Sequence, residues 1–125
     1  MANKYIFHRH RVKISESDLY KTYKIFFGTL VSQSRLRIIN LLRGGKKNVS
    51  EIVRDLDMNQ TTVSHDLARL KRCGFVKSER NHRFIYYVLN HGTIKLLMSI
   101  IDKHMSEYCI HILQSMKERG ENNGK

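Results

Sequence analysis

Cysteine is scarce in this sequence, and its scarcity argues against two classes of protein. Cys73 and Cys109 are the only two cysteines, too few for a disulfide scaffold. They show no CxxC or CxC spacing that would indicate a zinc site. We therefore expect each to be a small buried hydrophobic side chain, with a thiol-based redox function as the alternative.

Long hydrophobic runs are also missing. No uninterrupted apolar run exceeds six residues, whereas a membrane-spanning helix needs about 20. The first thirteen residues, MANKYIFHRHRVK, are rich in charge and lack the apolar core of a secretory signal. We therefore expect a cytoplasmic protein with no membrane partner.

Acidic residues are far outnumbered by basic ones. The chain has 11 Asp and Glu against 23 Lys and Arg, which gives a formal net charge of +12. Such a charge favours a polyanionic partner, because binding releases the counterions condensed on that partner. Nucleic acid and an anionic membrane are the candidates, and double-stranded DNA becomes the expected partner once the polar-faced segment 59–73 is considered. The 125 residues fit a single domain with its own core.

The sequence also lacks a recognisable catalytic arrangement. The sequence holds no Ser, His and acid set, no phosphate-binding loop and no paired carboxylates at a defensible spacing. Ser64 and His65 are neighbours, but adjacent side chains on a helix point in different directions. We therefore do not expect an enzyme.

The segment Asn59 to Cys73, NQTTVSHDLARLKRC, is the most informative stretch that is present. Val63, Leu67 and Leu70 form a narrow apolar stripe at helical spacing, and Asn59 is a good N-cap. Polar groups at the start of the outward face and cations further along are typical of a helix that reads DNA. The side chains that we expect to contact DNA from this helix are Gln60, Thr61, Thr62, Ser64, His65, Arg69 and Arg72. The alternative is an ordinary amphipathic surface helix.

Three helices are expected before this segment, after a flexible basic arm over residues 1–14. The first begins at Ser15, which has capping-box spacing to Asp18, and it carries an apolar, aromatic-rich stripe. After an interruption at residues 28–34, a second helix places Leu36, Ile39 and Leu42 inward and ends at Gly44 and Gly45. A short third helix over residues 48–56 then precedes the polar-faced helix, an order typical of a helix-turn-helix.

Residues 75–89 predict a β-hairpin. FVKSER and RFIYYVL are rich in aromatic and β-branched residues, and Asn81 with His82 forms the expected two-residue loop. Arg80, His82 and Arg83 cluster at the tip. A basic hairpin beside a helix-turn-helix is a wing, placed to contact flanking DNA, and the alternative is a solvated hairpin.

A long helix is expected from His91 to about Glu118. Ile94, Met98, Ile101, Met105, Tyr108 and Ile112 alternate steps of four and three, with Met116 one step further. Such a stripe needs a partner helix, so we expect a homodimer. Residues 119–125 are polar and are expected to be a disordered tail.

The order of these elements resembles the ArsR/SmtB family of dimeric transcriptional repressors. The matching phrases are SRLRIINLL, NQTTVSHDLARLKRCGFV and RNHRFIYYVL, and the similarity covers most of residues 15–118. The resemblance implies a mainly α fold with a small β-hairpin wing, a winged helix-turn-helix dimerised through its first and last helices. It also implies that Gln60, Thr61, Ser64 and His65 face the major groove, with two such helices about ten base pairs apart.

The resemblance implies less about an effector. Many family members hold a soft metal with a cysteine pair in the third helix, and here that helix, NVSEIVRDL, has none. A second family site in the last helix is matched by Asp102 and His104, but Ser115 stands where the third ligand belongs, Glu118 occupies the last position and His111 lies one turn too early. Zinc or a similar divalent transition metal is therefore an alternative effector, and no metal is the expectation.

Two further expectations complete the sequence reading. Asp66 flanks the inner face of its helix, where it is expected to pair with a neighbouring arginine instead of meeting phosphate. The leading function is a sequence-specific, dimeric transcriptional repressor. The alternative is an architectural or nonspecific DNA-binding protein, for which the charge of +12 alone would suffice.

Overall fold

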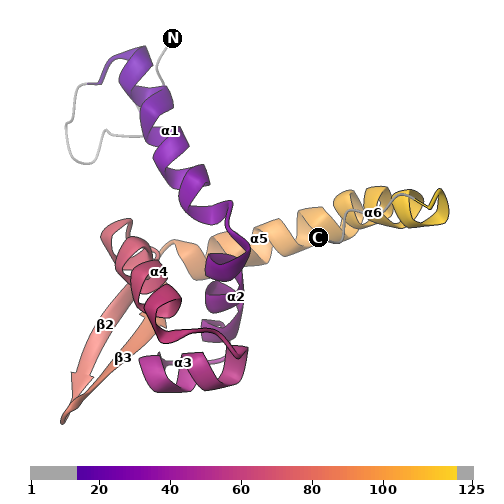
Figure 1. The fold of residues 1–125 in the computed structure, drawn as a ribbon. Coiled ribbons are helices and arrows are strands. Elements are labelled where there is room, and N and C mark those ends of the chain that lie inside the picture. The colour runs from indigo at the N-terminus through magenta and orange to yellow at the C-terminus, as the bar shows by residue number, and fades with distance from the viewer. Residues whose placement is uncertain (1–13, 121–125) are drawn as a thin grey trace.

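A computed structural model describes residues 14–120 of the chain (Figure 1). The elements in chain order are α1 (Glu16–Leu30), α2 (Gln33–Leu42), β1 (Lys47–Asn48), α3 (Val49–Leu56), α4 (Gln60–Arg72), β2 (Val76–Asn81), β3 (Phe84–Leu89), α5 (Ile94–Glu107) and α6 (Cys109–Glu118). A central body contains α2, α3, α4 and the hairpin, and α1 and the α5–α6 arm project from it (Figure 1). The expected basic arm and polar tail fall almost entirely outside the described residues.

Side-chain caps set the starts of α1, α3 and α4, and the caps of α1 and α4 are predicted from the sequence. Ser15 Oγ accepts a hydrogen bond from the Asp18 N–H at 3.0 Å, and Asn59 Oδ1 accepts one from the Thr62 N–H at 2.8 Å. Asn48 and Glu51 form a complete capping box at the start of α3. These bonds satisfy helix N–H groups that have no partner within the helix, so they fix where each helix begins.

The core lies between α2, α3, α4 and the base of the hairpin. Its fully buried side chains include Val63, Leu67 and Leu70, which confirms the predicted inner stripe of α4. Ile39 and Leu42 of α2 are buried as predicted, but the third inward residue is Ile38 and not Leu36. Leu36 is 40% exposed because it turns toward α5, where it lines a hollow with Met98 and Met105.

The sheet has one strand more than the sequence predicts. Lys47 and Asn48 form β1, which pairs antiparallel with Tyr87 and Tyr86, so the strand order is β1-β3-β2. Two residues show no recognisable period, which is why sequence reasoning misses this strand. The Lys47 ammonium donates to Asp55 of α3 at 2.9 Å, and this hydrogen bond lowers the pKa of the Asp55 carboxyl.

The hairpin loop is shifted by one residue from the prediction. Asn81 pairs with Phe84, so the two loop residues are His82 and Arg83. Within the loop, His82 has the left-handed backbone conformation, with φ of 58°. Pairing across the strands fixes this register, because a slip by one residue would move each side chain to the other face of the sheet.

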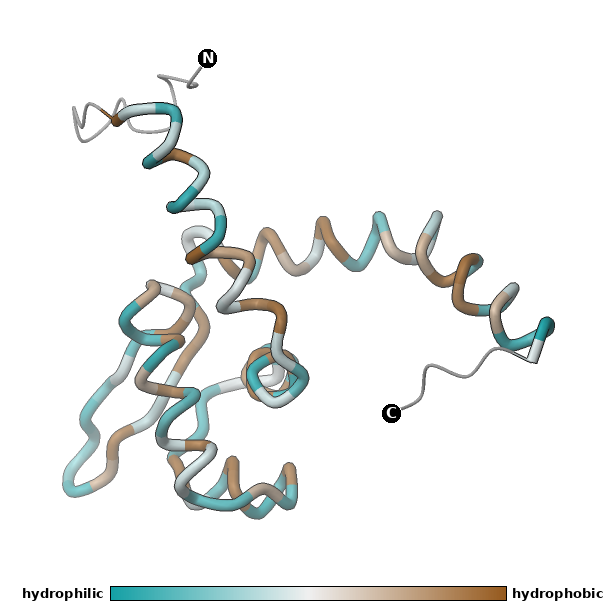
Figure 2. The backbone as a smooth tube through the Cα atoms, turned by 45° about the horizontal axis from the view of Figure 1, so that its top comes forward, coloured by the Kyte–Doolittle hydropathy of each residue, from teal (hydrophilic) through white to brown (hydrophobic). Residues whose placement is uncertain are grey.

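Helix α1 runs further than predicted, through Gly28 to Leu30, so the interruption is confined to Val31 and Ser32. Of its aromatic residues, Phe26 stacks on the buried Phe75 with ring centroids 5.1 Å apart. Tyr20, Tyr23 and Phe27 remain exposed. Hydrophobic segments are visible along α1 and along the α5–α6 arm, outside the body (Figure 2).

The prediction of a single helix after His91 is wrong, because the segment is divided into α5 and α6 at Tyr108. The Tyr108 backbone has φ −130° and ψ −64°, which lies outside the helical region. Its N–H still closes the last turn of α5, and its carbonyl accepts from His111 in the first turn of α6. The ring of His104 lies 4.8 Å from that of Tyr108. No glycine or proline marks this point in the sequence.

The apolar stripe of this region is also divided between two roles. Ile94 and Met98 are buried in the core of their own chain, and Ile101 packs against that core. Leu96 and Ile100, on another face of α5, are exposed. The stripe predicted as a dimer seam therefore starts inside the monomer core, because α5 is apolar on more than one face.

Candidate nucleic-acid interface

The N-terminal half of α4 presents a polar face to solvent. The five side chains proposed there are all exposed, namely Gln60, Thr61, Thr62, Ser64 and His65. Val63, which lies between them in sequence, and Leu67, which follows them, anchor the opposite face in the core. The helix therefore holds short hydrogen-bonding groups at its N-terminus, clear of the body, in the arrangement that allows contact with base edges.

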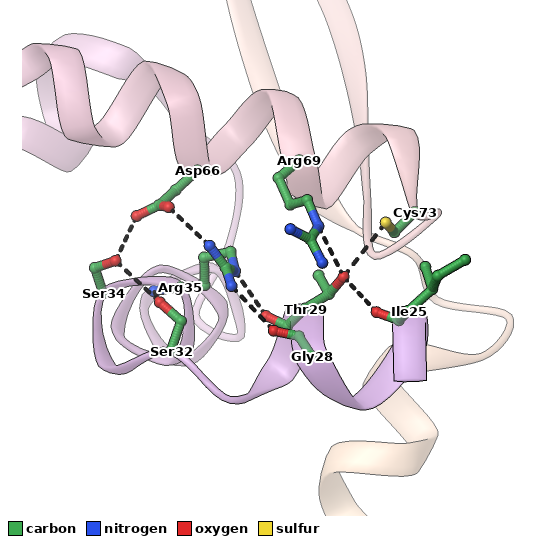
Figure 3. Close-up of polar contacts among 9 residues, drawn as sticks. All are labelled: Ile25, Gly28, Thr29, Ser32, Ser34, Arg35, Asp66, Arg69 and Cys73. Atoms are coloured by element: carbon green, nitrogen blue, oxygen red, sulfur yellow. Dashed lines mark hydrogen bonds and ion pairs between the residues drawn. The ribbon is translucent and has the colours of Figure 1, made fainter. Parts of the chain in front are cut away.

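Asp66 ties α4 to the start of α2 (Figure 3). The carboxylate is 7% exposed, pairs with Arg35 Nη1 at 3.3 Å and accepts a hydrogen bond from Ser34 Oγ at 2.5 Å. This confirms the expectation that Asp66 pairs with a neighbouring arginine. A buried carboxylate needs such partners, because its charge loses the solvation of water.

Arg35 also closes the end of α1. Its Nε donates to the Thr29 carbonyl at 2.7 Å and its Nη2 to the Gly28 carbonyl at 3.1 Å (Figure 3). The last carbonyls of a helix lack partners within it, and α1 has no basic residue in its own last turn. One guanidinium therefore joins the C-terminal end of α1, the start of α2 and the inner edge of α4. The sequence offers no signal for this three-way contact beyond the position of Arg35 near the start of its helix.

Arg69 is placed differently from the expectation. Its Nε donates at 3.0 Å to the hydroxyl of Thr29, which is fully buried and itself donates to the Ile25 carbonyl (Figure 3). Arg69 is half-buried between α4 and α1 instead of standing on the outward face of α4. Arg72, one turn further, is exposed with Lys71.

The two cysteines occupy different environments. Cys73 is half-buried, with its sulfur 3.4 Å from the Thr29 hydroxyl (Figure 3). Cys109 lies on α6 and is exposed, so the expectation that it is buried is wrong for the single chain. The reason is that no other part of the described chain covers α6. Both thiols are free.

The tip of the wing carries the three expected basic residues in exposed positions. Arg80 Nη1 donates to the His82 carbonyl at 3.2 Å, which orders the turn. The Arg83 guanidinium lies over the ring of Phe84, 5.7 Å from its centroid. The wing follows α4 directly, because the Phe75 N–H donates to the Leu70 carbonyl at the end of that helix. Basic groups are thus positioned beside the polar face of α4.

The candidate metal residues are spread along the α5–α6 arm. Asp102 pairs with Arg43 at 2.5 Å, and His104 lies against Tyr108. His111 and Glu118 are on α6 beyond the break. Within residues 14–120, no group of three or more His, Cys, Asp or Glu side chains is close enough to hold a metal ion. Over the same residues, no helix has the length and apolar character to cross a membrane.

The central segment of the chain matches a known protein family. The model described as "Bacterial regulatory protein, arsR family" matches residues 32–78, from the N-cap of α2 into β2. The transcriptional repressor SdpR of Bacillus subtilis (strain 168) is 28% identical over 81 residues, which are 62% of this chain and 90% of SdpR. The cadmium resistance transcriptional regulatory protein CadC of Listeria innocua serovar 6a is 32% identical over 76 residues, which are 60% of this chain and 64% of CadC.

Solved structures agree with these relatives. The homodimeric winged helix-turn-helix DNA-binding domain of Mb0332 from Mycobacterium bovis superposes with a TM-score of 0.70 at 26% identity, covering 81% of this chain and 94% of that domain. The matched segment contains the polar-faced helix and the elements that hold it. Residues 32–78 therefore match the ArsR family of bacterial regulatory proteins, and the chain is a DNA-binding transcriptional regulator with a winged helix-turn-helix fold.

Proposed function

We propose that two copies of this chain form a homodimer that binds a specific operator in the cytoplasm and represses transcription. Residues 15–118 form the functional domain, and the protein acts as a regulator without catalysis. The observation that carries this proposal is the exposed polar face of α4, from Gln60 to His65, on a helix whose other side is locked into the core. The similarity to the repressor SdpR supports repression as the outcome of binding.

The distribution of exposed apolar side chains supports dimerisation. All of the large exposed hydrophobic side chains on the described residues, except Leu36, Phe84 and Ile85, lie on α1, its C-cap, or the α5–α6 arm. They are Tyr20, Tyr23, Ile25, Phe27, Val31, Leu96, Ile100, Met105, Tyr108, Ile110, Ile112 and Leu113. Apolar surface concentrated on two projecting elements is typical of an interface between subunits. The similar Mb0332 domain is homodimeric.

Introducing a charge on this surface tests the dimer. Ile100 is exposed in the single chain, so Ile100→Glu should leave the monomer fold intact. In a dimer the carboxylate would be buried without a partner, so we expect the variant to be monomeric and to bind operator DNA at least about tenfold more weakly. Light scattering coupled to size-exclusion chromatography measures the mass. Ser99→Glu is the matched control, because it adds the same charge at the neighbouring exposed position. A wild-type chain that is itself monomeric would refute the dimer.

Substitutions on α4 and on the wing should have different consequences. Gln60→Ala and His65→Ala are each expected to reduce discrimination between operator and random duplex by about 1–3 kcal/mol, because base-edge hydrogen bonds are lost. Arg83→Ala should weaken binding to every sequence and lower the slope of log affinity against log salt by about one unit. Competition titrations at several salt concentrations measure both quantities. Equal losses on operator and random DNA for all three variants would favour the nonspecific DNA-binding alternative.

We propose the remaining DNA contacts from the exposure of the side chains in α4 and the wing. Thr61, Thr62 and Ser64 face the major groove with Gln60 and His65. Arg72, Arg80 and His82 meet phosphates or sugars. Arg69 is left out of this set, because its Nε is bonded to Thr29 inside the fold.

A divalent metal is the alternative effector, and similarity to the cadmium resistance regulator CadC is what favours it. We expect zinc to leave operator affinity unchanged. The Asp102 carboxylate is held by Arg43, and Ser115 provides no strong ligand at the third position of the family pattern. Metal analysis of the purified protein and DNA titrations with and without zinc measure this. A stoichiometric zinc ion that shifts DNA affinity, and that Asp102→Ala abolishes, would overturn this expectation.

A further inference from the structure

The wing has an aromatic pair on the face that points away from the core. Phe84 and Tyr86 are two residues apart on β3 and therefore share a face, with ring centroids 6.3 Å apart. The other face of the strand holds Tyr87 and Leu89, which pack in or against the core. Phe84 and Tyr86 are thus not part of the packing that holds the wing to the body.

A cation lies over each of these rings. The Arg83 guanidinium is 5.7 Å from the Phe84 centroid, and Lys46 Nζ is 5.3 Å from the Tyr86 centroid. Lys46 also pairs with Glu79 at 3.7 Å. These contacts hold the two rings in place on the strand, because a cation over an aromatic face is attracted by the ring quadrupole. Phe84 is therefore presented in a fixed position, directly after the turn.

Phe84 is only partly covered by the rest of the described chain. Its side chain is 47% exposed and lies on the rim of a hollow of about 210 Å³ between the wing and the start of α3. The tip of the wing is well separated in the fold from α1 and the α5–α6 arm (Figure 1), where the other large exposed hydrophobic residues gather, apart from Ile85 and Leu36. An exposed aromatic ring at the tip of a hairpin costs solvation free energy unless a partner covers it.

Charge and continuity identify DNA as that partner. The hairpin carries the cations Lys77, Arg80 and Arg83, and Lys46 adjoins it. Glu79 is the only acidic residue of the hairpin. The hairpin also continues directly from α4, so its tip reaches the duplex beside the groove that α4 would occupy. Apolar side chains that meet DNA in this way insert between base steps from the minor groove.

We propose that Phe84 is an apolar wedge that enters the minor groove flanking the operator and selects flexible pyrimidine–purine steps there. Arg83 and Tyr86 position the ring for this insertion. Partial unstacking of a step costs less where the step is flexible, such as TpA, than in a stiff A-tract. The wedge therefore reads deformability, a property that the polar face of α4 does not sense. This inference rests on the proposed DNA-binding function.

The experiment compares the wild-type protein, Phe84→Ala and Phe84→Leu on operator DNA with two kinds of flanking sequence. An operator is recovered by selecting this protein on a random duplex library, and its flanks are replaced by TpA steps or by A-tracts. If no operator is recovered, a random duplex with the same two flanks is used. We expect the wild-type protein to prefer TpA flanks by about tenfold, the range of one aromatic–base stacking contact. Phe84→Ala should lose this preference or reverse it, since Arg83 alone favours the narrow groove of an A-tract.

Phe84→Leu is the matched control, because leucine can also act as a wedge and should retain part of the preference. The salt dependence of binding should be unchanged in Phe84→Ala, since no charge is removed, whereas Arg83→Ala lowers it. An equal TpA preference in wild type and Phe84→Ala, or none in wild type, would overturn the wedge. Failure of the selection to yield an operator would count against sequence-specific binding instead, so the two failures are distinguishable.

Discussion

Asp66→Ala is expected to lower the free energy of unfolding by about 3 kcal/mol, the range for removing one partner of a buried ion pair. The Arg35 guanidinium keeps its bonds to the Gly28 and Thr29 carbonyls but loses its counter-charge, and Ser34 loses its acceptor. The junction of α1, α2 and α4 is therefore weakened at one point. Urea denaturation at a fixed protein concentration measures the change, since dimerisation contributes to apparent stability.

The same variant separates stability from DNA recognition. Because Asp66 fixes the inner edge of α4, its loss should also reduce operator discrimination under conditions where the variant remains folded. Asp66→Asn keeps the shape and a hydrogen bond to Ser34, so its loss of stability should be smaller. Asp55→Ala removes the surface pair with Lys47 and is the control for loss of a carboxylate, with a clearly smaller effect. Equal stability of Asp66→Ala and wild type would show that the buried pair contributes nothing net.

Phe75→Ala is expected to cost about 3–5 kcal/mol of unfolding free energy, the range for truncating a fully buried phenylalanine. Phe75 stacks on Phe26 of α1, and its backbone joins α4 to the hairpin: its N–H donates to Leu70 and its carbonyl accepts from Asn90. A cavity here would loosen the wing from α4 as well as from α1. Thermal and urea unfolding measure the loss.

Phe84→Ala provides the control for Phe75→Ala. It removes the same side chain from an exposed position on the wing, so its effect on stability should be about 1 kcal/mol or less. The two variants therefore have opposite profiles. Phe75→Ala should be severe for folding, and Phe84→Ala should act on the choice of flanking DNA. A similar loss of stability in both would contradict the assignment of Phe84 to the outer face.

Several features of the fold can be predicted from the sequence because they depend on interactions between residues close together in the chain. The caps at Ser15, Asn48 and Asn59 act on N–H groups three residues away, so the starts of three helices are readable directly. The buried stripe of α4 follows from helical spacing alone. The hairpin was predicted from residue types, and its loop was misplaced by one residue because strand pairing, a longer-range interaction, sets the register.

Other features could not be read locally. Two residues of β1 become a strand only because β3 offers an edge to pair with. The apolar stripe of α5 looks like one dimer seam in sequence, yet Ile94 and Met98 belong to the core of the same chain while Met105 is exposed. Periodicity identifies apolar positions without stating which neighbour covers each of them.

A basic helix-turn-helix with a wing, suited to DNA, can be predicted from the sequence, since charge, caps and spacing are properties of the chain alone. Only the packing of the helices shows how two of the cations of α4 are used. Arg69 and Arg72 are equivalent basic residues in the sequence, but the end of α1 packs against α4 and provides Thr29 as a buried acceptor for Arg69 alone. Packing between helices that are distant in sequence sets the partner of each charged side chain. No local sequence pattern contains that information.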